Sequence, residues 1–308
     1  MVTKSVTQEF IMNKNIRGCL ILLLAAIIWG FAFVAQSEGM DNVGALTFQA
    51  SRMLLGALVL LPVSFIIQKT RERASGKKER FLDKKTLIAG MVCGIFLFGA
   101  SALQQIGIKY TSVGHAGFLT ALYILIVPVL GIFMGKKVGV RIWLCIALSL
   151  GGLYLLCMTG EGFSMSAGDV LVTLCAFVFA LHIIAVDKLA AKLDGVKISF
   201  VQMTFAGIIS LVCAFIFEEP HIANISAAWL PIAYAGVLSC GVAYTLQIVG
   251  QKYAEPSVAS IVMSLESVFA VLGGAMLLSE FPTLYELFGC SLMFAATVIS
   301  QLPQKDKK

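Results

Sequence analysis

Long apolar segments separated by short polar turns run along most of the chain. Ten such segments follow a polar N-terminal tail: residues 17–37, 43–67, 86–107, 113–135, 140–159, 169–186, 197–217, 227–249, 256–278 and 284–302. Each is close to the ~20 residues that a helix needs to cross a hydrocarbon layer of about 30 Å. Backbone polar groups in lipid must be satisfied within the segment, so each segment is predicted to be helical. The pattern therefore predicts an all-α polytopic membrane protein with ten transmembrane helices.

Two stretches of the chain resemble each other at a constant offset. Leu246–Glu280 matches Leu103–Lys137 when Lys252 is placed on Lys109, which is an offset of 143 positions. Apolar residues match by chance in membrane segments, so the shared Q-x-x-G-x-K-Y turn is the main evidence for the match. Internal repeats of this kind indicate the fold. The chain is therefore predicted to contain two copies of one unit.

The distribution of basic residues predicts the orientation in the membrane. If the chain starts in the cytoplasm and crosses ten times, only Lys109 lies outside and Arg52 lies within a span. This leaves 21 of the 23 Lys and Arg residues on the cytoplasmic side, eight of them in the 68–85 loop. Such an asymmetry follows the positive-inside rule. Both tails, residues 1–16 and 303–308, are therefore predicted to be cytoplasmic in a plasma-membrane protein. The 68–85 loop is expected to be solvated and mobile.

Five spans in each copy place the second copy in the opposite orientation to the first. The predicted units are residues 17–159 and 160–302, so the fold is expected to be two inverted five-helix repeats. Inverted repeats related by a two-fold axis in the membrane plane are typical of secondary transporters, whose substrate sites lie near the midplane.

Composition agrees with a membrane protein and argues against several other interpretations of the sequence. Hydrophobic residues make up 59% of the chain and charged residues 13%, with a mean hydropathy of +0.92; an average soluble domain has about 25% charged residues. The net charge of +6 comes from short turns, so a nucleic-acid partner is not expected. The eight cysteines lie in apolar stretches without a CxxC pattern, so no disulfide framework, metal site or cofactor is expected. The apolar run after Arg17 is too long for a cleavable signal peptide.

Short motifs in several spans resemble those of the EamA-type transporters of the drug/metabolite transporter superfamily, over essentially the whole chain. The matching residues are Trp29-Gly30 with Phe33, Arg52, Pro128, Glu280 with Pro282, and Gly289. The first copy departs from the pattern, with Lys136-Lys137 where an acidic residue is expected, so that acid is not expected to be needed in both copies. The resemblance implies export or exchange of small metabolites, such as amino acids or amphipathic compounds. It does not identify the substrate.

Glu266 is the carboxylate placed near the middle of the membrane. It follows Pro256 by ten residues, which corresponds to a depth of roughly 15 Å at ~1.5 Å per residue. An ionisable group there costs about 2.5–3.5 kcal/mol on insertion scales and normally faces a cavity or a partner. Burial favours the neutral, protonated acid, so a role in binding a proton is possible. A nearby cation would instead favour the charged carboxylate. The alternative is a glutamate that only fixes helix packing. Its repeat counterpart is Tyr123, with Thr120 on the same helix face.

Arg52 lies about nine residues into the second span and cannot lose its charge, so it needs a carboxylate, carbonyl groups or water. Three roles are open to it: binding a substrate carboxylate, pairing with Glu266, or joining two spans. Gln49 lies on the same helix face, with Gln202 as its expected counterpart. His182, in the sixth span, is either a packed histidine or a proton relay. The candidate substrate-binding residues are Trp29, Gln49, Arg52, Thr120, Tyr123, His182, Gln202, Tyr244, Gln247 and Glu266.

These features favour a secondary transporter that works by alternating access, with a small-molecule substrate and membrane lipid as partners; protons are a further candidate. No Walker A sequence is present, so ATP is not the direct energy source. An intramembrane enzyme is not expected, because the chain has neither HExxH nor a pair of membrane aspartates. Exchange of nucleotide sugars or other phosphorylated metabolites is a weaker alternative, because only one basic residue lies deep in a span. A structural or sensory membrane protein is another alternative. Monomer and homodimer are both compatible with the sequence.

Overall fold

The protein is helical throughout the part of the chain that its computed structural model describes, residues 2–78, 80–111, 113–157, 166–277 and 282–301. Eight stretches of helix in these residues are long and apolar enough to cross a membrane, and two shorter apolar helices cover 140–155 and 284–300. Each of these ten stretches overlaps one of the ten predicted segments. The prediction of an all-helical, multi-pass membrane protein is therefore confirmed.

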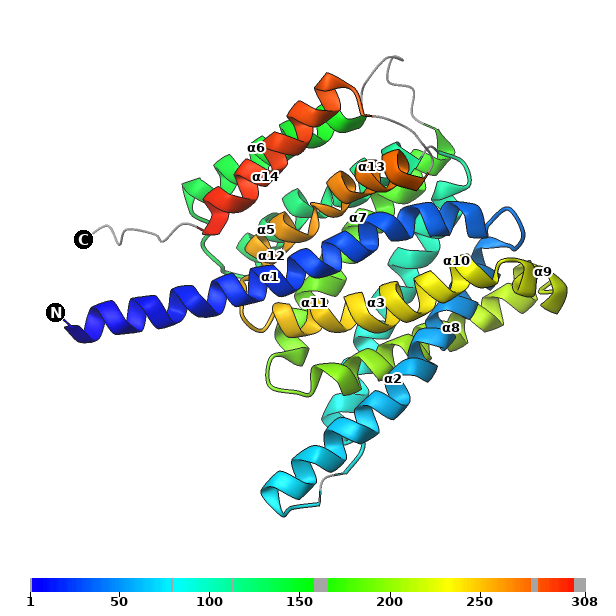
Figure 1. Ribbon diagram of the computed structural model, residues 1–308, viewed down its shortest axis with the longest axis horizontal. Helices are drawn as coiled ribbons and strands as arrows, with labels where there is room; N and C mark the ends of the chain where they lie inside the picture. The colour runs from blue at the N-terminus through cyan, green and yellow to red at the C-terminus, as the bar shows by residue number, and fades with distance from the viewer. Residues whose placement is uncertain (1, 79, 112, 158–165, 278–281, 302–308) are drawn as a thin grey trace.

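The helices follow one another along the chain with short connections (Figure 1). Those of the first half are α1 (Val2–Gly39), α2 (Ala45–Ser75), α3 (Lys84–Ile108), α4 (Val113–Ala121), α5 (Tyr123–Phe133) and α6 (Val140–Cys157). Those of the second half are α7 (Ala167–Ala190), α8 (Gly195–Phe217), α9 (Ile222–Ala227), α10 (Trp229–Ala233), the π-helix η1 (Tyr234–Ala243), α11 (Tyr244–Gly250), α12 (Pro256–Met263), α13 (Glu266–Leu277) and α14 (Leu284–Gln301).

The helix ends depart from the predicted segments in two places. Helix α1 begins at Val2 and so includes residues that the sequence assigns to a polar tail. Helix α2 continues to Ser75, well into the predicted 68–85 loop. The end of that loop is packed: the ring of Phe81 stacks on Phe65 at 4.1 Å and lies 6.0 Å from the ring of Phe200 on α8. Apolar packing of Phe81 thus anchors a loop that its charges alone suggest to be free in solvent.

The fourth and ninth segments are each divided into two half-helices. The break lies at Leu122 between α4 and α5, and at Ser264 and Leu265 between α12 and α13. At each break the backbone makes a 3₁₀-type bond, from Leu122 N to Leu119 O at 3.3 Å and from Leu265 N to Val262 O at 3.2 Å. Leu122 and Leu265 are 143 positions apart, so both copies break at the same point. Short 3₁₀ stretches inside a helix often mark hinges.

The eighth segment contains ten residues of π-helix, η1, between α10 and α11. Tyr234 in its first turn donates a hydrogen bond to the main-chain oxygen of Ile28 on α1 at 3.0 Å. The equivalent helix in the first copy, α3, is an α-helix from end to end. The two copies therefore differ in this helix. π-helical turns are rare and are frequently found at functional sites.

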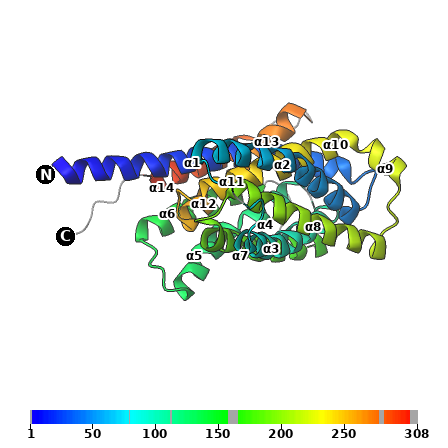
Figure 2. The same cartoon turned by 90° about the horizontal axis from the view of Figure 1, so that it is seen from below.

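Helices of the two halves pack on one another in corresponding pairs. Helix α2 packs along α8 and α6 along α14, and the α6–α14 pair lies on one side of the molecule (Figures 1 and 2). The third helix of each half packs on the first helix of the other, α3 on α7 and α11 with η1 on α1. The half-helices α4 and α5 contact α7, and α12 and α13 contact α1. The two halves are therefore interleaved rather than separate bodies.

Two glycines make the same close crossing in the two halves. A Cβ atom on Gly107 would lie 3.0 Å from Gly168 O, and a Cβ on Gly250 would lie 3.1 Å from Gly18 O. Small residues of this kind allow helix backbones to approach closely in membranes. Gly107 and Gly250 are repeat counterparts, and Gly168 follows Gly18 by 150 positions. The first helices of the two copies therefore align at an offset of 150, seven more than the offset of the later helices.

Polar contacts hold the helix ends together at both ends of the bundle. At one end the Glu218 carboxylate, after α8, accepts hydrogen bonds from Leu46 N at 2.9 Å, Thr47 N at 2.8 Å and Thr47 Oγ1 at 2.7 Å, which caps the start of α2. At the other end, turns predicted to be cytoplasmic meet. Burial there lowers the pKa of Lys252, and Asp194 opposes this shift. The contacts at this end are Arg71–Asp194, Lys136–Asp187 and Lys252–Leu193 O.

Candidate functional site

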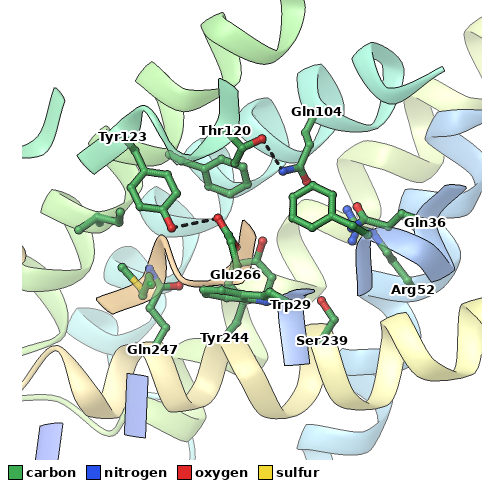
Figure 3. A pocket seen from close by; sticks show the side chains of 14 residues that line it. Trp29, Gln36, Arg52, Gln104, Thr120, Tyr123, Ser239, Tyr244, Gln247 and Glu266 are labelled. Carbon is green, nitrogen blue, oxygen red and sulfur yellow. Dashed lines mark hydrogen bonds between the residues drawn. The ribbon is translucent and has the colours of Figure 1, made fainter. Parts of the chain in front are cut away.

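A pocket of about 470 Å³ lies in the middle of the bundle, between the two halves of the chain. Side chains from α1, α2, α3, α4, α5, α7, η1, α11, α12 and α13 reach it (Figure 3). The residues that line it are Trp29, Phe33, Gln36, Arg52, Gln104, Thr120, Tyr123, Phe179, Ile183, Ser239, Tyr244, Gln247, Met263 and Glu266.

Tyr123 and Glu266 meet in the centre of this pocket (Figure 3). Each is the first residue of the half-helix that follows a break, Tyr123 of α5 and Glu266 of α13. The Tyr123 hydroxyl donates a hydrogen bond of 2.9 Å to Glu266 Oε1, and both side chains are buried. A helix N-terminus favours negative charge, whereas burial favours the neutral acid. The half-helix geometry therefore places a phenol and a carboxyl group in direct contact where the two breaks meet.

Arg52 lies on the opposite side of the pocket from Tyr123, beside Gln36 (Figure 3). Its side chain is 2% exposed, and its guanidinium carbon lies 5.9 Å from the centre of the Phe48 ring. Neither Nε nor Nη2 has a hydrogen-bond partner among the described residues. Within those residues there is also no ion pair between Arg52 and Glu266, so the expected alternative of a direct pair is not seen.

The remaining polar groups of the pocket are uncharged. Gln104 Nε2 donates to Thr120 Oγ1 at 3.1 Å, and the same oxygen lies 3.7 Å from Cys175 Sγ. Gln247 is the repeat counterpart of Gln104, but its Oε1 has no partner among the described residues. The residue that would match Thr120 at the offset of 143 is Met263, which cannot accept such a bond as well as a hydroxyl does. The two copies thus give the pocket one amide whose nitrogen bonds to a hydroxyl and one whose oxygen has no partner among the described residues.

Aromatic rings form the apolar wall. The Trp29 and Tyr244 rings meet edge to face with centroids 4.8 Å apart, and Phe33 is almost fully buried. The offset of 150 pairs Trp29 with Phe179 and Phe33 with Ile183, all four of which line the pocket. The apolar wall is therefore built from the same positions of the first helix in both copies. Such a wall with few polar groups suits an organic ligand.

Seven of the ten predicted site residues line the pocket and three do not. Those in the pocket are Trp29, Arg52, Thr120, Tyr123, Tyr244, Gln247 and Glu266. His182 is fully buried behind Tyr244, with ring centroids 6.2 Å apart, and its Nε2 lies 3.2 Å from Gln202 Oε1. Gln49 Nε2 bonds to Ser210 Oγ at 3.0 Å and to Phe98 O at 3.3 Å. These three side chains join helices next to the pocket.

Sequence reasoning missed several lining residues. Phe179 and Ile183 would have been found from the offset of 150. This offset differs from that of the later helices because α2, with 31 residues, is longer than α8, with 23. Ser239 lies on the π-helix, which no pattern in the sequence predicts. Gln36 lies seven residues after Trp29 on α1, so helical periodicity gives a weak signal for it.

The motif residues outside the pocket have packing roles where the structure describes them. A Cβ on Gly30 would lie 2.3 Å from the Cβ of Phe269, so the glycine lets α1 cross α13 closely. Pro128 is buried within α5. Glu280, with its E-x-P pattern, lies outside the described residues. In the part of the chain that the structure covers, no group of three or more His, Cys, Asp or Glu side chains could hold a metal ion.

Comparison with known proteins gives one consistent result. The EamA-like transporter family matches the chain twice, at residues 16–158 and 166–301. An "Uncharacterized transporter" of Archaeoglobus fulgidus is 27% identical over 94% of this chain and 87% of its own length. The "Uncharacterized transporter YoaV" of Bacillus subtilis is 24% identical over 88% of this chain and 92% of its own. A protein of known crystal structure shares the fold with a TM-score of 0.75 at 17% identity, covering 92% of this chain and 96% of that one.

Proposed function

Since the chain belongs to the EamA-like transporter family, we propose that it is a secondary transporter that exports or exchanges small organic metabolites by alternating access. Amino acids and amphipathic compounds are the substrate classes that fit a pocket with aromatic walls, one cation and one carboxyl group. The observation that carries this proposal is the central pocket. It is lined by residues of both halves of the chain, and in it Tyr123 donates a hydrogen bond to Glu266. Membrane transport is the activity that the family and its relatives support.

The two halves act in this proposal as two inverted five-helix repeats that cross the membrane ten times. The family match, which occurs once in each half, supports two copies. The paired crossings of Gly107 and Gly250 support a two-fold relation between them. The polar contacts at one end of the bundle support a common side for the turns that make them. The distribution of basic residues in the sequence favours the cytoplasm as that side and as the side of both termini. The protein is accordingly proposed to lie in the plasma membrane.

Alternating access then consists of one set of helices moving relative to the other around the pocket. The breaks at Leu122 and Leu265 are suitable hinges, because each lies next to the residue that faces the pocket centre. The α2–α8 pair is fixed at both of its ends, by Glu218 and by the Arg71–Asp194 ion pair, and would move as one body.

Glu266 is the proposed carrier of a coupling proton. It is buried in the pocket, and its bond with Tyr123 is available to either protonation state, because a protonated acid still has a carbonyl oxygen that accepts. No described residue forms an ion pair with Glu266, so its carboxyl group can change its protonation as the pocket opens to one side or the other. Substrate binding and proton binding would thereby be linked in one cavity.

A nucleotide-sugar or other phosphorylated-metabolite exchanger is a second candidate. Arg52 favours it because the guanidinium binds phosphate as well as carboxylate. Against it, Arg52 is the one basic residue among those that line the pocket, and Glu266 would repel a multiply charged phosphate. A catalytic role has no such support, and a transporter without enzyme activity is the simpler proposal.

The proposal is tested by a thermal-shift screen of the purified protein against metabolites, followed by counterflow in liposomes with each compound that stabilises it. We expect stabilisation by a compound that combines an anionic group with an apolar body, and counterflow of that compound. Binding without any counterflow would contradict transport and would favour a structural or sensory membrane protein.

A further inference from the structure

Arg52 carries a buried positive charge for which the described residues supply no ion-pair partner. The side chain is 2% exposed, and two of its three nitrogens have no hydrogen-bond partner in the residues that the structure covers. The Phe48 ring at 5.9 Å is a weak partner for a guanidinium. Arginine does not lose its proton in proteins, so the charge cannot be removed by titration. A buried cation of this kind normally faces a partner or a cavity.

The carboxyl group of Glu266, which lines the same pocket, makes its hydrogen bond with Tyr123 and forms no ion pair with Arg52 among the described residues. Glu266 accepts the hydrogen bond from Tyr123, and Figure 3 shows Tyr123 on the side of the pocket opposite Arg52. Gln36, next to Arg52, donates its own amide to Ala32 O at 3.2 Å. The other polar side chains that line the pocket are neutral. Among the described residues, then, no acidic side chain pairs directly with Arg52, and an anion that enters the pocket from solution could do so.

We propose that the Arg52 side of the pocket is a subsite for a monovalent anionic group, a carboxylate or sulfonate, carried by a compact amphipathic molecule. This inference rests on the proposed function and specifies its substrate class. The guanidinium offers a planar pair of donors that match such a group. Trp29 and Phe33, which line the same pocket as Arg52, provide an apolar surface for a ring or short alkyl body. Chloride is the inorganic anion of the same charge that can take the subsite when no organic anion is present.

The uncompensated charge also determines which steps of the cycle are fast. While the pocket is closed to both sides, Arg52 has neither bulk water nor a protein partner unless an anion is bound. Removing one partner of a buried ion pair is strongly unfavourable. The anion-loaded pocket is therefore expected to pass through the closed state faster than the empty one. The protein should exchange anions across the membrane more readily than it moves them in one direction.

Binding of the anion is tested by titration calorimetry of the full-length protein in nanodiscs. The probes are benzenesulfonate, its neutral analogue benzenesulfonamide, and chloride as a competitor. We expect benzenesulfonate to bind in competition with chloride, and Arg52→Gln to weaken this binding at least ~10-fold, as loss of a charged hydrogen bond predicts. Binding of the sulfonamide should not change. Equal binding of the sulfonate to the wild type and Arg52→Gln, or no binding of either anion to the wild type, would overturn the subsite.

Two further variants separate the subsite from general effects of the substitution. Arg17→Gln removes the same charge from an exposed position over the Tyr253 ring, outside the pocket, and should bind the sulfonate like the wild type. Arg52→Lys keeps the charge but loses the planar pair of donors, so it should retain competition by chloride while the sulfonate binds more weakly. If Arg52→Gln does not fold, Arg52→Lys is the variant that tests the subsite. If Arg52→Lys binds the sulfonate as tightly as the wild type does, the planar contact is overturned.

The exchange step is tested in liposomes by uptake of labelled benzenesulfonate. Vesicles preloaded with unlabelled benzenesulfonate should take up the label faster than vesicles preloaded with sorbitol. Equal rates would overturn preferential exchange. Absence of uptake in both, together with Arg52-dependent binding in calorimetry, would count against the proposed transport function and leave the anion subsite in place.

Discussion

The Tyr123 hydroxyl and the Glu266 carboxyl group are 2.9 Å apart in the centre of the bundle, although they lie 143 positions apart in the chain. The same distance in sequence separates all equivalent residues of the repeated turn and the following helix. If the two copies are related by the proposed two-fold axis, equivalent positions can touch only close to that axis. The proposal therefore places the Tyr123–Glu266 contact, and with it the centre of the pocket, on the axis.

Removing the Tyr123 hydroxyl should weaken the protein without changing its fold. In Tyr123→Phe the buried Glu266 oxygen loses its donor, which is expected to cost about 1–3 kcal/mol. Thermal unfolding in detergent measures this as a lower midpoint. Tyr154→Phe, on an exposed tyrosine of α6, is the matched control and should have the stability of the wild type. Equal stability of both variants would mean that the Tyr123–Glu266 bond contributes nothing.

Gly30 should be intolerant of a side chain, because α13 lies against it. A Cβ there would be 2.3 Å from Phe269 Cβ and 2.6 Å from the main-chain carbon of the same residue. Overpacking of this kind typically costs about 1–3 kcal/mol. Gly30→Ala is therefore expected to lower the unfolding midpoint and the yield of folded protein. Gly151→Ala, at a helical glycine with nothing within 4 Å of its added Cβ, is the control and should behave like the wild type.

Glu218 should stabilise the start of α2 from the end of α8. Its carboxylate accepts three hydrogen bonds from Leu46 and Thr47, so Glu218→Ala removes the cap of α2 at an expected cost of about 1–2 kcal/mol. Glu219→Ala is the neighbouring control, because the Glu219 side chain is 93% exposed. Thermal unfolding of both variants gives the comparison. If Glu219→Ala is as destabilised as Glu218→Ala, the effect comes from charge at this end and not from the cap.

Residue 75 at the end of α2 and residue 306 in the C-terminal tail are both predicted to be cytoplasmic. Single cysteines at these positions, in a chain whose native cysteines have been replaced, should react with a membrane-impermeant reagent only after the cells are opened. A cysteine at position 221, between α8 and α9, should react in intact cells. Labelling of either of the first two positions from outside would contradict ten crossings with cytoplasmic termini.

The sequence predicts the helical segments well because crossing a membrane imposes a simple rule on length and polarity. Apolar runs therefore predict α3 and α8 to within a few residues. Breaks within a run are different, because lipid does not penalise a short 3₁₀ turn whose groups bond locally. Ser264 returns its hydroxyl to Ile261 O, a contact that bends helices, but no equivalent side-chain bond accompanies the break at Leu122. The π-helix η1 likewise has no signal in the apolar pattern.

The candidate site is predictable to the extent that charge is rare in the membrane. Glu266 and Arg52 stand out because an ionisable group in a span needs a reason to be there. Neutral residues give no such signal, and their roles depend on how the helices are rotated. Gln49 and His182 are as polar as Gln247, yet they face neighbouring helices and bond to Ser210 and Gln202. Only the packing of the two halves determines which of these polar side chains face the pocket and which face a neighbouring helix.

Counterflow of a stabilising metabolite in liposomes, with and without a pH gradient, tests the central claim that this pocket is the site of transport. The wild type should show counterflow, and well-folded Arg52→Gln should lose most of it. Glu266→Gln keeps an oxygen that can accept from Tyr123, so it should fold. It should retain exchange but lose any dependence on the gradient, because the amide cannot carry the proton. Full counterflow by both variants would contradict the assignment of the pocket, and a gradient dependence that survives in Glu266→Gln would show that the coupling proton binds elsewhere, with His182 the next residue to test.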